Sequence, residues 1–113
     1  MVLISGIKIL ESKNIFISLT GIHGIGISNS IKILNILKIN SLIKTKNLKD
    51  VEIKQIIKII NQSFILEGNL KLKVNLDIKN LINMKSYRGK RHIKKLPVRG
   101  QRTKTNAKTC RKK

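Results

Sequence analysis

The strongest periodic signal in the sequence lies near the middle of the chain and predicts an amphipathic helix. Four isoleucines recur there at i, i+3, i+4 and i+7, which is one face of an α-helix: Ile53, Ile56, Ile57 and Ile60. Asp50 precedes them at a spacing that suits an N-cap, because its carboxylate can accept a backbone N–H of the first turn. We therefore expect a helix that begins near Asp50 and turns its isoleucine face toward a core.

A second helix is predicted from Ser28 to about Ile39, with Ser28 as its N-cap. Its side chains expected to face inward are Ile31, Leu34 and Leu37. Residues 38–49 are rich in Lys and Asn and predict an irregular connection. Three apolar side chains of this connection are expected to pack back against the helices: Leu42, Ile43 and Leu48.

The segment from Leu70 to Ile78 alternates apolar and polar residues strictly, which is typical of a β-strand with one buried face. The same segment also fits a helix, because an apolar stripe recurs at i, i+4, i+8 and i+11: Leu70, Val74, Ile78 and Leu81. The alternation favours a strand, but periodicity by itself leaves both structures open.

A glycine-rich turn, residues 19–26, precedes the predicted second helix and contains Gly21, Gly24 and Gly26. Glycines permit positive φ angles and close backbone approach, so N–H groups can face an anion at the start of a helix. We expect this glycine turn to hold a backbone phosphate of a nucleic acid. An ordinary helix-to-helix turn anchored by Ile22 and Ile25 explains the same pattern, and the two roles are compatible. His23 is expected to be a loop residue rather than a catalyst, because no Ser, Cys or carboxylate is spaced to serve it.

The charge of the chain identifies a nucleic acid as the expected partner. The 113 residues carry 25 Lys and Arg against 5 Asp and Glu, a net charge of +20, and a compact protein with this charge needs a polyanion to offset its self-repulsion. The aromatic residues are only Phe16, Phe64 and Tyr87, too few for a base-stacking platform, so contacts with phosphate and with groove shape are favoured.

The charge is concentrated toward the C-terminus. Residues 1–84 hold 12 Lys and all 5 acidic residues, a net +7, whereas residues 85–113 hold 13 Lys and Arg and no acid, a net +13. The second segment has few apolar residues with which to offset the entropy of ordering its backbone. We expect a globular domain over residues 1–84, followed by a basic tail over residues 85–113 that becomes ordered only on a nucleic acid.

Other function classes find little support in the sequence. Cys110 is the only cysteine and His23 and His92 are the only histidines, so neither a disulfide nor a metal site is expected. No catalytic residues, cofactor, membrane span or presequence are expected either. The abundance of Ile, Lys and Asn indicates an AT-rich gene, which is common in organelles and reduced bacteria.

The basic segment also contains a long ordered motif. It begins Tyr87-Arg88-Gly89-x-Arg91-His92 and continues Leu96-Pro97-Val98-Arg99-Gly100-Gln101-Arg102-Thr103-Lys104-Thr105-Asn106-Ala107. This order closely resembles the signature of the bacterial-type small-subunit ribosomal protein thirteen family. The resemblance extends to Ile-Ser-Gly-Ile at residues 4–7, Leu-Thr-x-Ile-x-Gly-x-Gly at residues 19–26 and Glu67-Gly68-x-Leu70.

The resemblance implies a mainly α fold: a small helical domain with a helix-two-turn-helix motif, a long helix over about Glu67 to Met84, and an extended basic C-terminal tail. It favours a helix over a strand for the alternating segment. It also implies an rRNA-binding role for the three turn glycines and for the basic segment. The residues implied are Gly21, Gly24, Gly26, Arg88, Lys90, Arg91, His92, Lys94, Lys95, Arg99, Arg102, Lys104, Lys108 and Arg111. Ile27 and Asn29, however, stand where the family usually has basic residues.

The implied function is that of a structural protein in the head of the small ribosomal subunit, near the intersubunit bridge and the transfer RNA sites. The implied partners are small-subunit rRNA, small-subunit protein nineteen, large-subunit protein five and transfer RNA. The Thr109-Cys110-Arg111 ending resembles mitochondrial members, so a mitochondrial ribosome is expected, with a plastid or an AT-rich bacterium as alternatives. The competing hypothesis is an architectural DNA-binding protein, because helix-hairpin-helix DNA binders use a similar glycine turn.

Overall fold

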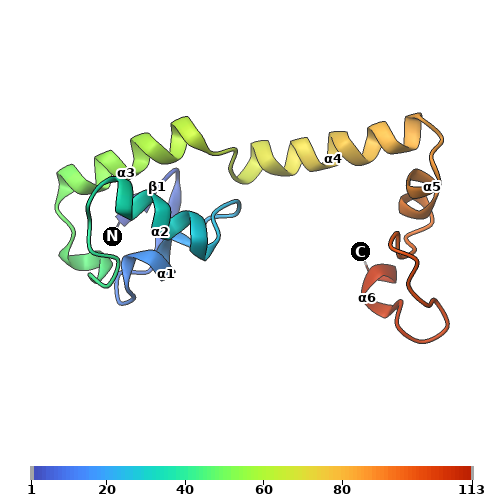
Figure 1. Ribbon diagram of the computed structural model, residues 1–113, viewed down its shortest axis with the longest axis horizontal. Coiled ribbons are helices and arrows are strands. Elements are labelled where there is room, and N and C mark those ends of the chain that lie inside the picture. The colour runs from blue at the N-terminus through green and yellow to red at the C-terminus, as the bar shows by residue number, and fades with distance from the viewer. Residues whose placement is uncertain (1, 113) are drawn as a thin grey trace. The chain divides into compact units, whose positions relative to one another are not determined.

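The computed structural model describes residues 2–112 and groups them into two compact units, one ending at Leu70 and the other beginning at Lys71 (Figure 1). Helices dominate both units, so the expected mainly α fold is confirmed. No helix within residues 2–112 is both long enough and apolar enough to cross a membrane.

The first unit combines a small hairpin with short and medium helices (Figure 1). Its elements are β1 (Val2–Ile4), β2 (Ile7–Ile9), α1 (Ile15–Leu19), α2 (Ile27–Ile36), the 3-10 helix η1 (Thr45–Asn47) and α3 (Asp50–Ser63), followed by the start of α4 (Glu67–Asn83). The two strands pair antiparallel, with Val2 opposite Ile9. Ser5 and Gly6 close the hairpin with φ angles of 51° and 80°, and positive φ at both central residues suits the twist of a two-residue turn.

The core of this unit consists almost entirely of isoleucine and leucine side chains. Its buried members are Ile4, Ile9, Ile15, Leu19, Ile22, Ile25, Ile33, Leu34, Ile39, Leu48, Ile56 and Ile60. The predicted isoleucine face of α3 is confirmed, because Ile56 and Ile60 are fully buried while Ile53 and Ile57 pack against the core. Burial of these branched side chains is the main source of stability for the unit.

The predicted helix starts were wrong by one or two residues. Asp50 is the first residue of α3 rather than its cap; the cap is Lys49, whose backbone N–H donates to the Glu52 carboxylate at 2.9 Å. The second helix begins at Ile27 with Gly26 as its N-cap, so Ser28 lies inside its first turn. A side-chain hydrogen bond is absent at Gly26, and this cap therefore depends on backbone conformation alone.

The predicted inward face and end of α2 also need correction. The helix ends at Ile36, and its buried apolar residues are Ile33 and Leu34. Leu37 lies just beyond the helix and is half-buried, whereas Ile31 is 38% exposed. The abundance of isoleucine explains the error, because several different faces of this helix look apolar in the sequence.

The connection between α2 and α3 packs back as expected through Ile43 and Leu48, but Leu42 is 66% exposed. A buried hydroxyl pair adds to this contact, since Thr45 Oγ1 donates to Ser18 Oγ at 3.0 Å. Ser18 Oγ donates in turn to the Leu10 carbonyl at 2.8 Å. The hydrogen bonds satisfy polar groups that would otherwise destabilise the core.

The alternating segment forms helix α4, so the strand alternative was wrong and the helix implied by the resemblance is confirmed. None of the residues of α4 is buried, and Leu72, Val74 and Leu76 remain 48 to 59% exposed. The alternation therefore does not reflect a sheet with one buried face. Leucine and lysine are also among the better helix formers, which is compatible with this result.

The second unit contains the rest of α4, helix α5 (Tyr87–Ile93) and the short helix α6 (Lys108–Arg111). The α4–α5 corner, residues 81–89, is held by Ser86: its hydroxyl donates to the Leu81 carbonyl at 2.8 Å and accepts the Gly89 N–H at 3.1 Å. Residues 85–112 thus have more local structure than their composition predicts.

Candidate nucleic-acid interface

The glycine turn joins α1 to α2 and is anchored from beneath by two isoleucines. Ile22 and Ile25 are 0% and 4% exposed, which confirms their predicted role as anchors in the core. Backbone hydrogen bonds from Ile22 N–H to the Leu19 carbonyl and from Ile25 N–H to the Ile22 carbonyl, both 3.1 Å, shape the turn. Its backbone is consequently held in place by the core on one side.

The three glycines of the turn have different structural surroundings. Gly24 has a φ of 111°, and a Cβ there would lie 3.0 Å from both the Ile65 carbonyl oxygen and Leu66 Cδ2. A Cβ at Gly21 would lie 3.3 Å from the Ser18 carbonyl oxygen. Gly26 has no atom within 4 Å of a built Cβ, so its surroundings are open. Close packing therefore explains why position 24 is a glycine. At Gly26, by contrast, nothing packs against the backbone.

Unpaired backbone donors gather where the turn becomes α2. Within residues 2–112, no protein acceptor is found for the N–H groups of Gly26, Ile27, Ser28 and Asn29. These groups form the positive end of the helix dipole, an arrangement that favours an anion. Ile27 and Asn29 bring no positive side chain to this end, so an anion here would be held by backbone groups.

The backbone of His23 is paired within the protein and is not available to an anion. Its N–H donates to Glu67 Oε1 at 2.7 Å, and its carbonyl accepts the Glu67 N–H at 3.0 Å. The imidazole itself is exposed. Among residues 2–112 there is no group of three His, Cys, Asp or Glu side chains that could hold a metal ion.

The basic side chains of the second unit are mostly accessible to a large partner. Among the residues with an expected RNA-binding role, the exposed ones are Arg88, Lys90, Lys94, Lys95, Arg99, Arg102, Lys104, Lys108 and Arg111. Arg91 and His92 are half-buried. Since no acidic residue occurs in residues 85–113, these cations have no acidic neighbour along that segment, and a polyanion can neutralise them.

Two arginines of the basic segment also support its local structure. Arg91 Nε donates to the Pro97 carbonyl at 3.0 Å, and its guanidinium lies 5.9 Å from the centroid of the Tyr87 ring. Arg111 Nη2 donates to the Thr103 carbonyl at 3.0 Å. Arg91 of α5 therefore holds the chain at Pro97 close to this helix. The other N–H groups of its guanidinium remain able to donate.

Comparison with known proteins decides between the ribosomal and the DNA-binding hypotheses. Residues 3–109 match the family described as ribosomal protein S13/S18. The chain is also 52% identical over 111 residues to small ribosomal subunit protein uS13c of Gracilaria tenuistipitata var. liui, a match covering 98% of this chain and 88% of the relative. The chain belongs to the ribosomal protein S13/S18 family.

Membership in the S13/S18 family gives the protein a structural, non-enzymatic role in the small ribosomal subunit, with rRNA as its partner. The match includes the glycine turn and nearly all of the basic segment. The DNA-binding alternative is therefore set aside.

One glycine of the S13/S18 signature is required by packing. Gly89 is buried, and a Cβ there would collide with the Leu81 carbonyl and lie 2.8 Å from Ile82 Cα. Gly89 thus allows α5 to pack against the end of α4. Gly100, in contrast, has a φ of 70° and no atom within 4 Å of a built Cβ, so it remains open.

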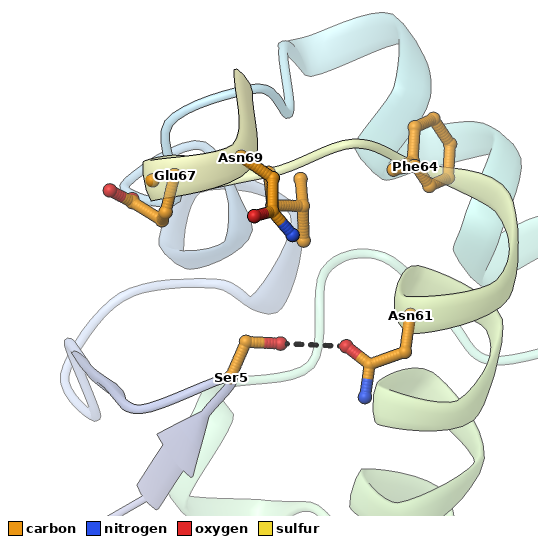
Figure 2. Close-up of a pocket in the computed structure, with 7 residues that line it drawn as sticks. Ser5, Asn61, Phe64, Glu67 and Asn69 are labelled. Atoms are coloured by element: carbon orange, nitrogen blue, oxygen red, sulfur yellow. Dashed lines mark hydrogen bonds between the residues drawn. The ribbon is translucent and has the colours of Figure 1, made fainter. Parts of the chain in front are cut away.

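Sequence reasoning also missed a polar pocket in the first unit of this S13/S18 protein. It is lined by Ser5, Asn61, Phe64, Leu66, Glu67, Gly68 and Asn69. Figure 2 shows the Ser5 hydroxyl donating to Asn61 Oδ1, a bond of 3.1 Å, with Asn69 above it. These residues come from the β1–β2 turn, α3, the α3–α4 link (residues 64–66) and the first turn of α4, and no sequence periodicity connects them.

Proposed function

We propose that the protein binds small-subunit rRNA through two surfaces, the glycine turn with the start of α2 and the basic side chains of residues 85–112. The first surface would place Gly21, Gly24 and Gly26 against phosphate. Because the Gly21 N–H is already paired with the Ser18 carbonyl at 3.2 Å, Gly26 would supply a donor where Gly21 does not. The second would use the basic residues of the segment: Arg88, Lys90, Arg91, His92, Lys94, Lys95, Arg99, Arg102, Lys104, Lys108 and Arg111. The observation that carries the proposal is the row of unpaired N–H groups at Gly26 to Asn29.

The two surfaces would contribute differently to binding. Backbone donors at a helix start hold a phosphate in one geometry, whereas exposed Lys and Arg neutralise charge over a longer stretch of RNA. Arginine adds bidentate contacts with phosphate, and all five arginines lie in residues 85–113. We infer that the turn sets the register of the protein on rRNA and that the basic segment supplies most of the affinity.

The position in the ribosome is a further part of the proposal. We place the protein in the head of the small subunit, beside small-subunit protein nineteen, with large-subunit protein five across the intersubunit bridge and transfer RNA within reach of residues 85–113. Family membership and the accessible cations of the basic segment support this placement. Crosslinking within assembled particles tests it, and crosslinks confined to other parts of the subunit would contradict it.

We also propose that the ribosome is organellar. The abundance of Ile, Lys and Asn and the similarity to uS13c of Gracilaria tenuistipitata var. liui support an organelle. The Thr109-Cys110-Arg111 ending favours a mitochondrion, with a plastid as the alternative. Fractionation of purified organelles followed by mass spectrometry of their ribosomes distinguishes the two.

The salt dependence of binding tests the role of the basic segment. Replacing Arg102→Gln and Lys104→Gln together should weaken binding to a small-subunit rRNA transcript and lower the slope of log K against log salt by about 1 to 2. Lys8→Gln with Lys58→Gln is the matched control, because both residues are exposed lysines of the first unit. An equal loss of slope in both double variants would contradict a specific role for the basic segment.

A further inference from the structure

Glu67 has a backbone conformation that is unusual for its residue type. It begins α4 with a φ of 45°, a left-handed angle that glycine adopts readily and that a longer side chain adopts only with strain. Gly68 follows directly and has no such angle. Glu67 lines the polar pocket, but in Figure 2 its side chain points away from the Ser5–Asn61 hydrogen bond. That hydrogen bond therefore does not explain the carboxylate at this position.

The contacts of Glu67 provide one. Its Oε1 accepts the His23 N–H at 2.7 Å, and its own N–H donates to the His23 carbonyl at 3.0 Å. One residue thus holds both backbone groups of His23, 44 positions away in the sequence. The adjoining Gly24 lies so close to Ile65 and Leu66 that a Cβ would be only 3.0 Å from each. The α3–α4 link and the glycine turn are therefore in direct contact at two neighbouring residues.

We propose that Glu67 is a positioning residue of the glycine turn, which its carboxylate and N–H fix in the conformation that presents the α2 amides to rRNA. The proposal rests on the proposed contact between the turn and phosphate. It adds that the turn is fixed before RNA binds, by an acidic residue that itself touches no RNA. Charge-assisted hydrogen bonds to backbone N–H groups are among the stronger ones, which suits this role.

The same contact determines which amides remain for phosphate. The His23 N–H is already paired with a carboxylate, and a second anion close to that carboxylate would be repelled. Unpaired donors lie further along, at Gly26, Ile27, Ser28 and Asn29. Glu67 therefore directs phosphate toward the open side of the turn, where a Cβ built on Gly26 meets no atom within 4 Å.

Two substitutions in the full-length protein test this role. Glu67→Gly removes the carboxylate while suiting the positive φ, so backbone strain does not confuse the result. Glu67→Gln keeps an oxygen that can accept the His23 N–H but removes the charge. Glu52→Ala is the matched control, because Glu52 also accepts a backbone N–H, that of Lys49 at 2.9 Å, and its loss changes the net charge equally. The measurements are amide hydrogen exchange at His23 and affinity for a small-subunit rRNA transcript.

In Glu67→Gly we expect exchange at His23 to be about tenfold faster and rRNA binding about tenfold weaker than in Glu52→Ala, consistent with loss of one charge-assisted hydrogen bond. Glu67→Gln should retain most of the protection of the His23 amide from exchange and most of the affinity for rRNA. Binding by Glu67→Gly that equals or exceeds that of the control would overturn the proposal. Fast exchange at His23 in the unaltered free protein would also overturn it, even if a variant failed to fold.

A third substitution separates this proposal from the one on which it rests. Gly26→Asp places a carboxylate at the N-cap of α2, where it satisfies the helix but excludes phosphate. If Gly26→Asp leaves rRNA affinity unchanged, the turn does not bind phosphate and both proposals fail. If Gly26→Asp weakens binding but Glu67→Gly behaves like Glu52→Ala, only the role of Glu67 is refuted.

Discussion

The two units of the molecule are stabilised by different interactions. Up to Leu70 the chain carries 9 Lys against 4 acidic residues and buries twelve Ile and Leu side chains in one core. From Lys71 onward it carries 16 Lys and Arg against Asp77 alone, and its buried residues within the described part are Gly89, Pro97 and Ala107. The second unit depends on local hydrogen bonds and has a large charge still to be neutralised. A ribosomal protein can therefore combine a self-sufficient domain with a segment whose final stability comes from RNA.

The largest expected effect lies in the core of the first unit. Ile60→Ala should lower the free energy of unfolding by about 2 to 5 kcal/mol, because it removes buried methyl groups and leaves a cavity. Leu72→Ala, at a side chain that is 59% exposed, is the matched control in α4 and should change stability little. Denaturant unfolding followed by circular dichroism measures both. Similar losses in the two variants would mean that α4 is stabilised by burial as well.

A smaller effect is expected at the α4–α5 corner. Gly89→Ala places a Cβ against backbone atoms of Leu81 and Ile82. The substitution should therefore destabilise the packing of α5 on the end of α4 by about 1 to 3 kcal/mol. Faster amide exchange in α5, with unchanged exchange in α3, is the expected result. Gly68→Ala serves as the control, because its built Cβ meets no atom within 4 Å. If exchange also changed in α3, the two units would not be independent.

The smallest effect is expected from the cap of α5. Ser86→Ala removes the acceptor for the Gly89 N–H and should destabilise α5 by about 1 kcal/mol. Amide exchange at Gly89 should increase most. Adding a small-subunit rRNA transcript should suppress the difference between Ser86→Ala and the unaltered protein, because bound RNA stabilises the ordered segment. A difference that persists in the complex would show that the corner does not depend on RNA.

Sequence patterns predicted the first unit better where one face of a helix is clearly apolar. The isoleucines of α3 were identified correctly because polar residues separate them from the other faces. In α2, by contrast, Ile27 and Ile36 are 60% and 68% exposed, so apolar residues occur on several faces and the inward one was misassigned. Its N-cap was missed because Gly26 offers no side chain that marks a helix start.

The candidate site was predictable only in part. Local motifs indicate the turn glycines and the basic residues as candidates, but the pairing of His23 with Glu67 joins positions 44 apart and has no local signal. The structure of the basic segment was underestimated for a related reason. The folded structure of this segment depends on individual hydrogen bonds, such as those of Ser86 with Gly89 and of Arg91 with Pro97. Amino-acid composition cannot predict such bonds.

The isoleucine-rich core also has a consequence for the entropy of folding. Isoleucine is branched at Cβ and has few rotamers to lose, so its burial costs about 0.5 to 1 kcal/mol of side-chain entropy, compared with up to about 2 for methionine. With 22 isoleucines in 113 residues, the chain is well supplied with a side chain that orders readily. The most abundant residue of the sequence is therefore well suited to packing the first unit.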